Sequence, residues 1–134
     1  MGTIYVARSV KFSEWASDVG LSKHVFKVGY TDDPVEELVQ AGWGGADDWT
    51  VVRKKTADGL DEAALIAKLA RKEKLIDPNY YPRLKGVSGF FKVAPDHVEN
   101  SIFVAKSMAN DALPKAFKAK PVDFADYLIQ NALK

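Results

Sequence analysis

The chain has 134 residues, of which 47% are hydrophobic and 11% aromatic, so it is long and apolar enough to form one domain with a buried core. It contains no cysteine, which excludes disulfide bonds, thiolate chemistry and cysteine-ligated zinc sites. No apolar run approaches the roughly 20 residues that span a bilayer, so we expect a cytoplasmic protein without a membrane partner.

The net charge is only +1, but the charges are distributed unevenly along the chain. Residues 53–85 hold 9 basic and 5 acidic residues, whereas residues 1–52 hold 4 basic and 8 acidic ones. The basic middle segment could face an anion such as a nucleic-acid backbone. It could also be a solvated helix face followed by exposed strand ends.

The first part of the chain predicts two strands, because residues 3–9 and 24–30 are rich in β-branched and aromatic side chains. We expect them to pair as an antiparallel hairpin with a long connection. That connection should contain a short helical turn at residues 13–16, with Ser13 as its N-cap.

A helix at residues 34–41 is predicted to follow the second strand. Asp33 is a suitable N-cap, Pro34 suits the first helical position, and Glu36 lies where a capping box needs an acid. Gly42 is expected to end this helix.

The remaining elements complete an α+β domain in which helices flank a small mixed or antiparallel sheet. They are, in order, a strand at 49–55, a helix at 61–74, a strand at 89–93, a helix that begins at Pro95, and a last helix at 122–132. We expect residues 1–109 to form the core domain. Residues 110–134 would then be a linker and a C-terminal helical extension packed on the same domain.

Four short motifs follow one another in a recognisable order. The first strand carries Ile4-Tyr5-Val6 and the second carries Lys27-Val28-Gly29, after which Thr31-Asp32-Asp33-Pro34 opens a helix. Gly89-Phe90-Phe91-Lys92-Val93 forms a late aromatic strand. This order resembles the GIY-YIG nuclease superfamily, in particular its divergent phage and bacterial branch. The resemblance covers about residues 3–104 and implies a GIY-YIG-like core with an added C-terminal helix.

Members of that family cut DNA with a tyrosine that helps to activate water, an arginine on the first helix and a glutamate that holds a metal. The resemblance therefore implies catalytic roles for Tyr5, Lys27 and Tyr30. It implies that Glu62 is the metal ligand, with Mg²⁺ or another divalent metal as cofactor if the protein is active. It also places Gly29 where DNA approaches the strand.

Each of these residues also has an ordinary structural interpretation. Tyr5 could be a half-buried strand tyrosine, Lys27 a solvated lysine, and Gly29 a bulge without a ligand. Glu62 could be an acid that complements the positive end of a helix.

The chain departs from the family pattern at Glu37, which stands where the family has its arginine. A carboxylate repels phosphate, so we expect little or no cleavage. The sequence therefore indicates a GIY-YIG-like domain that binds nucleic acid or protein without efficient nuclease activity. The residues expected at a nucleic-acid interface are Gly29, Lys54, Lys68 and Lys72. The alternatives are an active, divergent metal-dependent DNA endonuclease and a phage-type structural or regulatory protein with no nucleic-acid role.

Overall fold

A computed structural model describes residues 2–21, 24–43, 46–81, 84, 87–108 and 119–133, with the backbone alone for 105–108. Its centre is a five-stranded sheet in the order β3-β1-β2-β5-β4, and every pairing in it is antiparallel. The strands are β1 (Thr3–Arg8), β2 (Val25–Thr31), β3 (Thr50–Thr56), β4 (Lys74–Leu75) and β5 (Phe90–Lys92). The predicted α+β class and the antiparallel pairing of the first two strands are confirmed.

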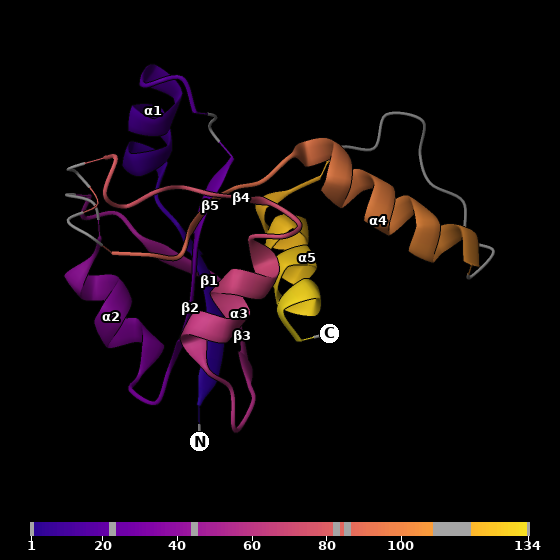
Figure 1. Ribbon diagram of the computed structural model, residues 1–134, viewed down its shortest axis with the longest axis horizontal. Coiled ribbons are helices and arrows are strands. Elements are labelled where there is room, and N and C mark those ends of the chain that lie inside the picture. The colour runs from indigo at the N-terminus through magenta and orange to yellow at the C-terminus, as the bar shows by residue number, and fades with distance from the viewer. Residues whose placement is uncertain are drawn as a thin grey trace.

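Helices cover both faces of this sheet (Figure 1). They are α1 (Val10–Asp18), α2 (Val35–Ala41), α3 (Glu62–Leu69), α4 (Pro95–Met108) and α5 (Pro121–Leu133). Figure 1 shows α1 and α2 on one side of the strands and α3 and α5 on the other. The C-terminal helix α5 thus belongs to the same packed unit as the sheet, while the part of the predicted linker at 110–118 lies outside the described residues.

The core has two layers because both faces of the central strands are apolar. One cluster joins Ile4, Val6, Phe26 and Val28 of the sheet to the apolar faces of α3 and α5. The other surrounds Phe12 of α1 with aromatic side chains from the opposite face, among them Trp49 and Phe90. Most residues of β1 and β2 are therefore buried whichever face they point to, whereas β3 is largely exposed.

Two helices begin differently from the prediction. Helix α1 starts at Val10, and its N-cap is Ser9, whose Oγ accepts a hydrogen bond from the Phe12 N–H at 3.0 Å. The prediction of Ser13 as the cap is wrong, because α1 continues the chain directly from β1 and Ser13 is buried inside the helix. Helix α2 has Pro34 at its N-cap without a side-chain cap, so the prediction of an Asp33 cap is also wrong.

Helix α3 ends at Leu69, five residues before the predicted end at Lys74. The backbone N–H groups of Lys72 and Glu73 both donate to the Leu69 carbonyl, each at 2.9 Å, and the chain then turns away from the helix axis. Residues Lys74 and Leu75 form the short strand β4, which the sequence did not predict, because pairing with β5 replaces the last helical turn.

Candidate functional site

Tyr5 and Gly29 face each other across β1 and β2, where they are directly paired in the register. A Cβ placed on Gly29 would lie 2.4 Å from the Tyr5 hydroxyl oxygen, so the phenol ring lies directly over the glycine. Tyr5 is only 3% exposed. The glycine within this strand thus has a packing reason: the space that a side chain would fill holds the Tyr5 ring.

Lys27 lies on the same face of β2 as Gly29 and is buried, with 3% of its surface exposed. Its ammonium donates a hydrogen bond to the Val28 carbonyl at 3.1 Å. It also lies 5.4 Å from the ring centre of Trp43 and 5.8 Å from those of Tyr5 and Phe90. Cation–π attraction to these rings replaces part of the lost hydration.

Burial nevertheless lowers the pKa of Lys27 from 10.5 to about 8, and the negative charge of Glu62 compensates only in part. Burial, with a smaller contribution from Glu62, raises the pKa of the Tyr5 phenol well above its usual range. A tyrosine that resists deprotonation is poorly suited to act as a base toward water.

The backbone at Gly89 keeps room for the Lys27 side chain. Gly89 has φ = 106°, a conformation that favours glycine, and an added Cβ would lie 2.7 Å from the lysine Nζ. Trp43 closes the other side, because its ring is stacked on Tyr5 and packs edge-on against Trp49. Tyr5 and Lys27 are therefore enclosed by aromatic side chains, and we call this group the Tyr5 cluster.

Glu62, the first residue of α3, lies at the edge of this cluster. Its Oε2 accepts a hydrogen bond from the backbone N–H of Tyr30 at 2.8 Å, at a point where β2 has no strand partner from β5. Its charge influences the pKa of both Tyr5 and Lys27. The structure thus brings together Tyr5, Lys27, Gly29 and Glu62, as the resemblance implied.

Tyr30 does not join them, because alternation along β2 directs its ring to the opposite face of the sheet. There the ring lies over Gly2, and the hydroxyl donates to the Ala57 carbonyl at 2.6 Å. Only the backbone of Tyr30 takes part in the site, through its hydrogen bond to Glu62.

The residues around Glu62 do not form a metal site by themselves. One oxygen of the carboxylate already accepts the Tyr30 N–H, and no group of three His, Asp or Glu side chains that could hold a metal occurs in the described parts of the chain. A magnesium ion usually binds one or two carboxylates together with waters and substrate phosphates. The donors present therefore do not fit a preformed metal centre.

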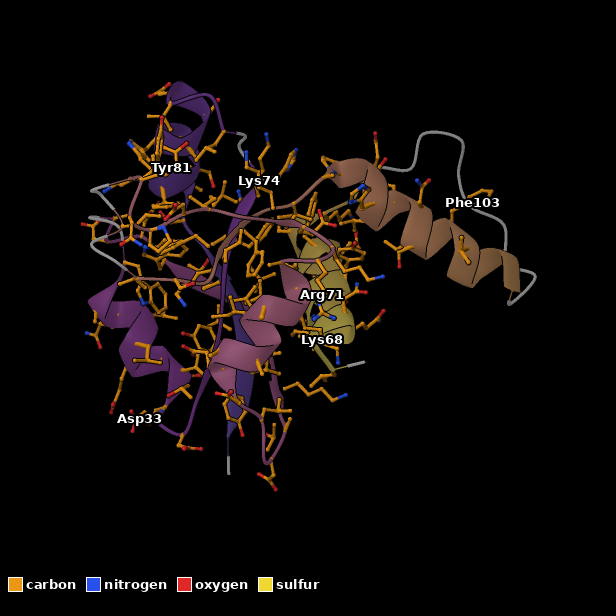
Figure 2. All side chains as sticks on the ribbon, in the orientation of Figure 1. Asp33, Lys68, Arg71, Lys74, Tyr81 and Phe103 are labelled. Atoms are coloured by element: carbon orange, nitrogen blue, oxygen red, sulfur yellow. The ribbon has the colours of Figure 1, made fainter. Side chains whose placement is uncertain are left out.

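The lysines predicted at a nucleic-acid interface do not share one surface. Lys54 lies on β3, on the face that carries Tyr5, and forms a salt bridge with Glu36 of α2. Lys68 and Lys72 are exposed at the end of α3, on the other side of the sheet. Figure 2 shows Lys68 beside Arg71, with Lys74 farther along at β4. We call the three residues Lys68, Arg71 and Lys72 the α3 basic surface.

Glu37 lies exposed in the first turn of α2, where a carboxylate complements the positive end of the helix. Lys54 contacts the same turn, but it does so through a salt bridge with Glu36. Among the described residues, Glu37 itself has no salt-bridge partner.

The sequence did not indicate two pockets that lie outside the Tyr5 cluster. One is a pocket of about 470 Å³ between α1 and the start of α5, lined in part by Arg8, Glu14, His24 and Phe124. The other is a smaller pocket near β4 that Lys74, Lys92 and His97 help to line. Both are built from residues far apart in the sequence, so no local motif could have indicated them.

Comparison with models of known protein families, with curated proteins and with solved structures returned no match. The likeness to the GIY-YIG nucleases thus rests on the motifs alone. No helix in the described part of the chain is both long and apolar enough to cross a membrane.

Proposed function

We propose that this protein is a GIY-YIG-like domain that binds nucleic acid, DNA in the first instance, and does not cut it efficiently. The observation that carries the proposal is the α3 basic surface. Its three side chains are exposed, and none of them forms a salt bridge with another described residue. Cations without acidic partners are available to neutralise phosphates.

The cluster around Lys27 supports the proposed absence of efficient cleavage. Tyr5 and Lys27 lie beneath Trp43 and Phe90, so a phosphodiester could not reach them without displacing aromatic side chains. Glu37 adds a negative charge where the family has a cation. Loss of one preorganised charge-stabilising group typically costs about 10²–10³ in rate. A cytoplasmic location belongs to the same proposal, because nucleic acid is present there.

An active metal-dependent endonuclease is the second candidate, favoured by the convergence of Tyr5, Lys27 and Glu62. A plasmid-nicking assay with Mg²⁺ and Mn²⁺ separates the two candidates. Metal-dependent nicking by the wild type that Tyr5→Phe and Glu62→Ala both abolish would establish the nuclease.

Fluorescence anisotropy with labelled duplex, single-stranded and branched DNA at low salt tests the binding itself. Arg71→Glu combined with Lys68→Glu should weaken binding at least tenfold. Arg71→Glu alone should also weaken binding. Lys55→Glu, on β3 at the opposite edge of the sheet, makes the same change of charge as this single variant and should weaken binding much less. Failure of the wild type to bind any nucleic acid would refute the proposal and favour a structural or regulatory protein with a protein partner.

A further inference from the structure

The larger pocket lies at the end of the sheet where β1 runs into α1 and where β2 begins, and the start of α5 also lines it. Its volume is about 470 Å³. Pockets that hold small molecules usually measure about 300–1,000 Å³, so a whole small ligand can enter this one.

One wall of the pocket is apolar and largely aromatic. The ring of Phe124 on α5 is stacked with that of His24, at 5.0 Å between centres, and with that of Phe26, at 5.2 Å. Phe26 and Phe124 are buried, whereas Val10, the first residue of α1, is 55% exposed. All four residues line the pocket. An apolar group of a ligand would pack against this wall and remove the Val10 side chain from water.

A positive charge lies beside the apolar wall. Val6 and Val28 are paired in the register of β1 with β2, and alternation places Arg8 and Phe26 on the same face of the sheet as these two valines. Arg8 is half-buried and forms no salt bridge with a described residue. A guanidinium group has five N–H donors in a planar arrangement that matches a carboxylate. The pocket therefore offers a partner for a carboxylate.

Two negative charges line the pocket from α1. Glu14 and Asp18 are four residues apart and therefore lie on one face of this helix. Both are exposed, and neither forms a salt bridge with Arg8 or with another described residue. Like charges at this spacing destabilise a helix. An ammonium group bound between the two carboxylates would relieve their repulsion.

Ser13, which precedes Glu14 on α1, also lines the pocket. It is only 5% exposed, and its Oγ has no hydrogen-bond partner in the described part of the chain. Buried polar side chains are nearly always hydrogen-bonded, and a serine can change its rotamer to meet a partner. A polar ligand in the pocket would supply the partner that the protein does not.

We propose that this pocket binds a free α-amino acid with an apolar side chain. Such a molecule carries a carboxylate and an ammonium group on one carbon, which matches unpaired charges of both signs in one pocket. Its carboxylate binds Arg8, its ammonium group binds Glu14 and Asp18, and its side chain packs against Phe124. A peptide terminus carries only one of the two charges. The inference does not depend on nucleic-acid binding, because none of these residues belongs to the α3 basic surface.

Titration of the ¹⁵N-labelled protein with L-phenylalanine at pH 7 tests the pocket. Saturable NMR shifts should be centred on Ser13, Glu14, Asp18 and Phe124. The analogue 3-phenylpropionate lacks the ammonium group, and phenethylamine lacks the carboxylate. Each should bind at least about tenfold more weakly, because each loses one charge-assisted interaction. L-Phenylalanine shifts that do not saturate, or equal binding of the three compounds, would overturn the proposal.

Substitutions then assign the two charges of the ligand. Arg8→Gln should weaken L-phenylalanine binding at least about tenfold and leave phenethylamine binding unchanged. Glu14→Gln with Asp18→Asn should weaken L-phenylalanine binding and leave 3-phenylpropionate binding unchanged. Lys55→Gln on β3 also removes one positive charge, but it lies outside the pocket and should leave all three affinities unchanged. Equal losses for all three compounds in Arg8→Gln would refute the assignment of the carboxylate to Arg8.

Ser13→Ala tests the unpartnered hydroxyl. Without ligand the variant should be at least as stable as the wild type, because a buried hydroxyl without a partner does not stabilise the fold. Its affinity for L-phenylalanine should fall about fivefold, as expected for one lost hydrogen bond. Thermal denaturation with and without L-phenylalanine measures both effects. Lower stability without ligand, together with unchanged affinity, would contradict the contact between Ser13 and the ligand.

Discussion

Replacing Lys27 by Met should change how stability depends on pH. In the folded protein burial lowers the pKa of Lys27 from 10.5 to about 8, whereas the unfolded chain exposes the amine and restores its ordinary value. Between these two values the unfolded state binds more protons than the folded state. The free energy of unfolding therefore rises with pH in this window.

The size of the effect follows from the difference of about 2.5 between the two pKa values, at 1.36 kcal/mol for each pKa unit. The buried charge of Lys27 therefore lowers the free energy of unfolding by about 3 kcal/mol at low pH. About 2 kcal/mol of this loss should be recovered between pH 7 and 9.5. Above pH 10 the raised pKa of the Tyr5 and Tyr127 phenols acts in the opposite sense, because the unfolded state then loses protons first. Measurements should therefore stop near pH 9.5.

Urea denaturation of the wild type and of Lys27→Met at several pH values measures this contribution. The wild type should gain stability as the pH rises, and the variant should lack most of that gain. At pH 7 the variant should be as stable as the wild type or more so, because an apolar side chain removes a buried charge. Lys55→Met is the control for a solvated lysine. An equal pH slope in Lys27→Met and the wild type would refute the description of Lys27 as a buried cation.

Three further predictions concern single residues. Gly29→Ala should destabilise the fold by about 1–3 kcal/mol, because its methyl group would overlap the Tyr5 ring; thermal or urea denaturation measures the loss, and a change below about 0.5 kcal/mol would contradict the close approach of the ring. Glu73→Gln should lower the free energy of unfolding by about 1–3 kcal/mol, because the amide oxygen cannot accept from Ala94, His97 and Tyr127 together. Unchanged stability in urea denaturation would show that these hydrogen bonds do not stabilise the fold. Glu37→Arg should raise nicking activity only if the other catalytic groups are correctly arranged. With Tyr5 and Lys27 buried we expect no increase, and a marked increase in a plasmid-nicking assay would contradict the claim that their burial prevents cleavage.

The larger strands were predictable because local patterns and tertiary packing agree there. β-Branched and aromatic residues mark β1 and β2, and the hairpin pairing follows from their order. Strand β4 was not predictable, because two residues within the basic run after α3 have no period of their own. Only pairing with β5 makes them a strand, and that contact comes from residues distant in the sequence.

The sequence indicated that Tyr5, Lys27, Gly29 and Glu62 would lie together, but it wrongly included the Tyr30 side chain and did not indicate that the site is buried. Lys27 alternates with apolar neighbours on β2, and a strand lysine in that pattern is normally solvated. The aromatic cover comes from Trp43 and Phe90, which the order of elements alone does not place over Lys27. The apolar character of both faces of β2 was the available signal that neither face would reach water.

Salt-dependent DNA binding by the wild type, with the same sample then checked for strand breaks, tests the central claim most directly. If the α3 basic surface contacts about three phosphates, the logarithm of the association constant should fall with a slope of about −2.7 against the logarithm of the salt concentration. Lys68→Glu with Arg71→Glu should flatten this slope, and the DNA should remain intact in the presence of Mg²⁺. An unchanged slope in the double variant, or efficient cleavage by the wild type, would contradict the account.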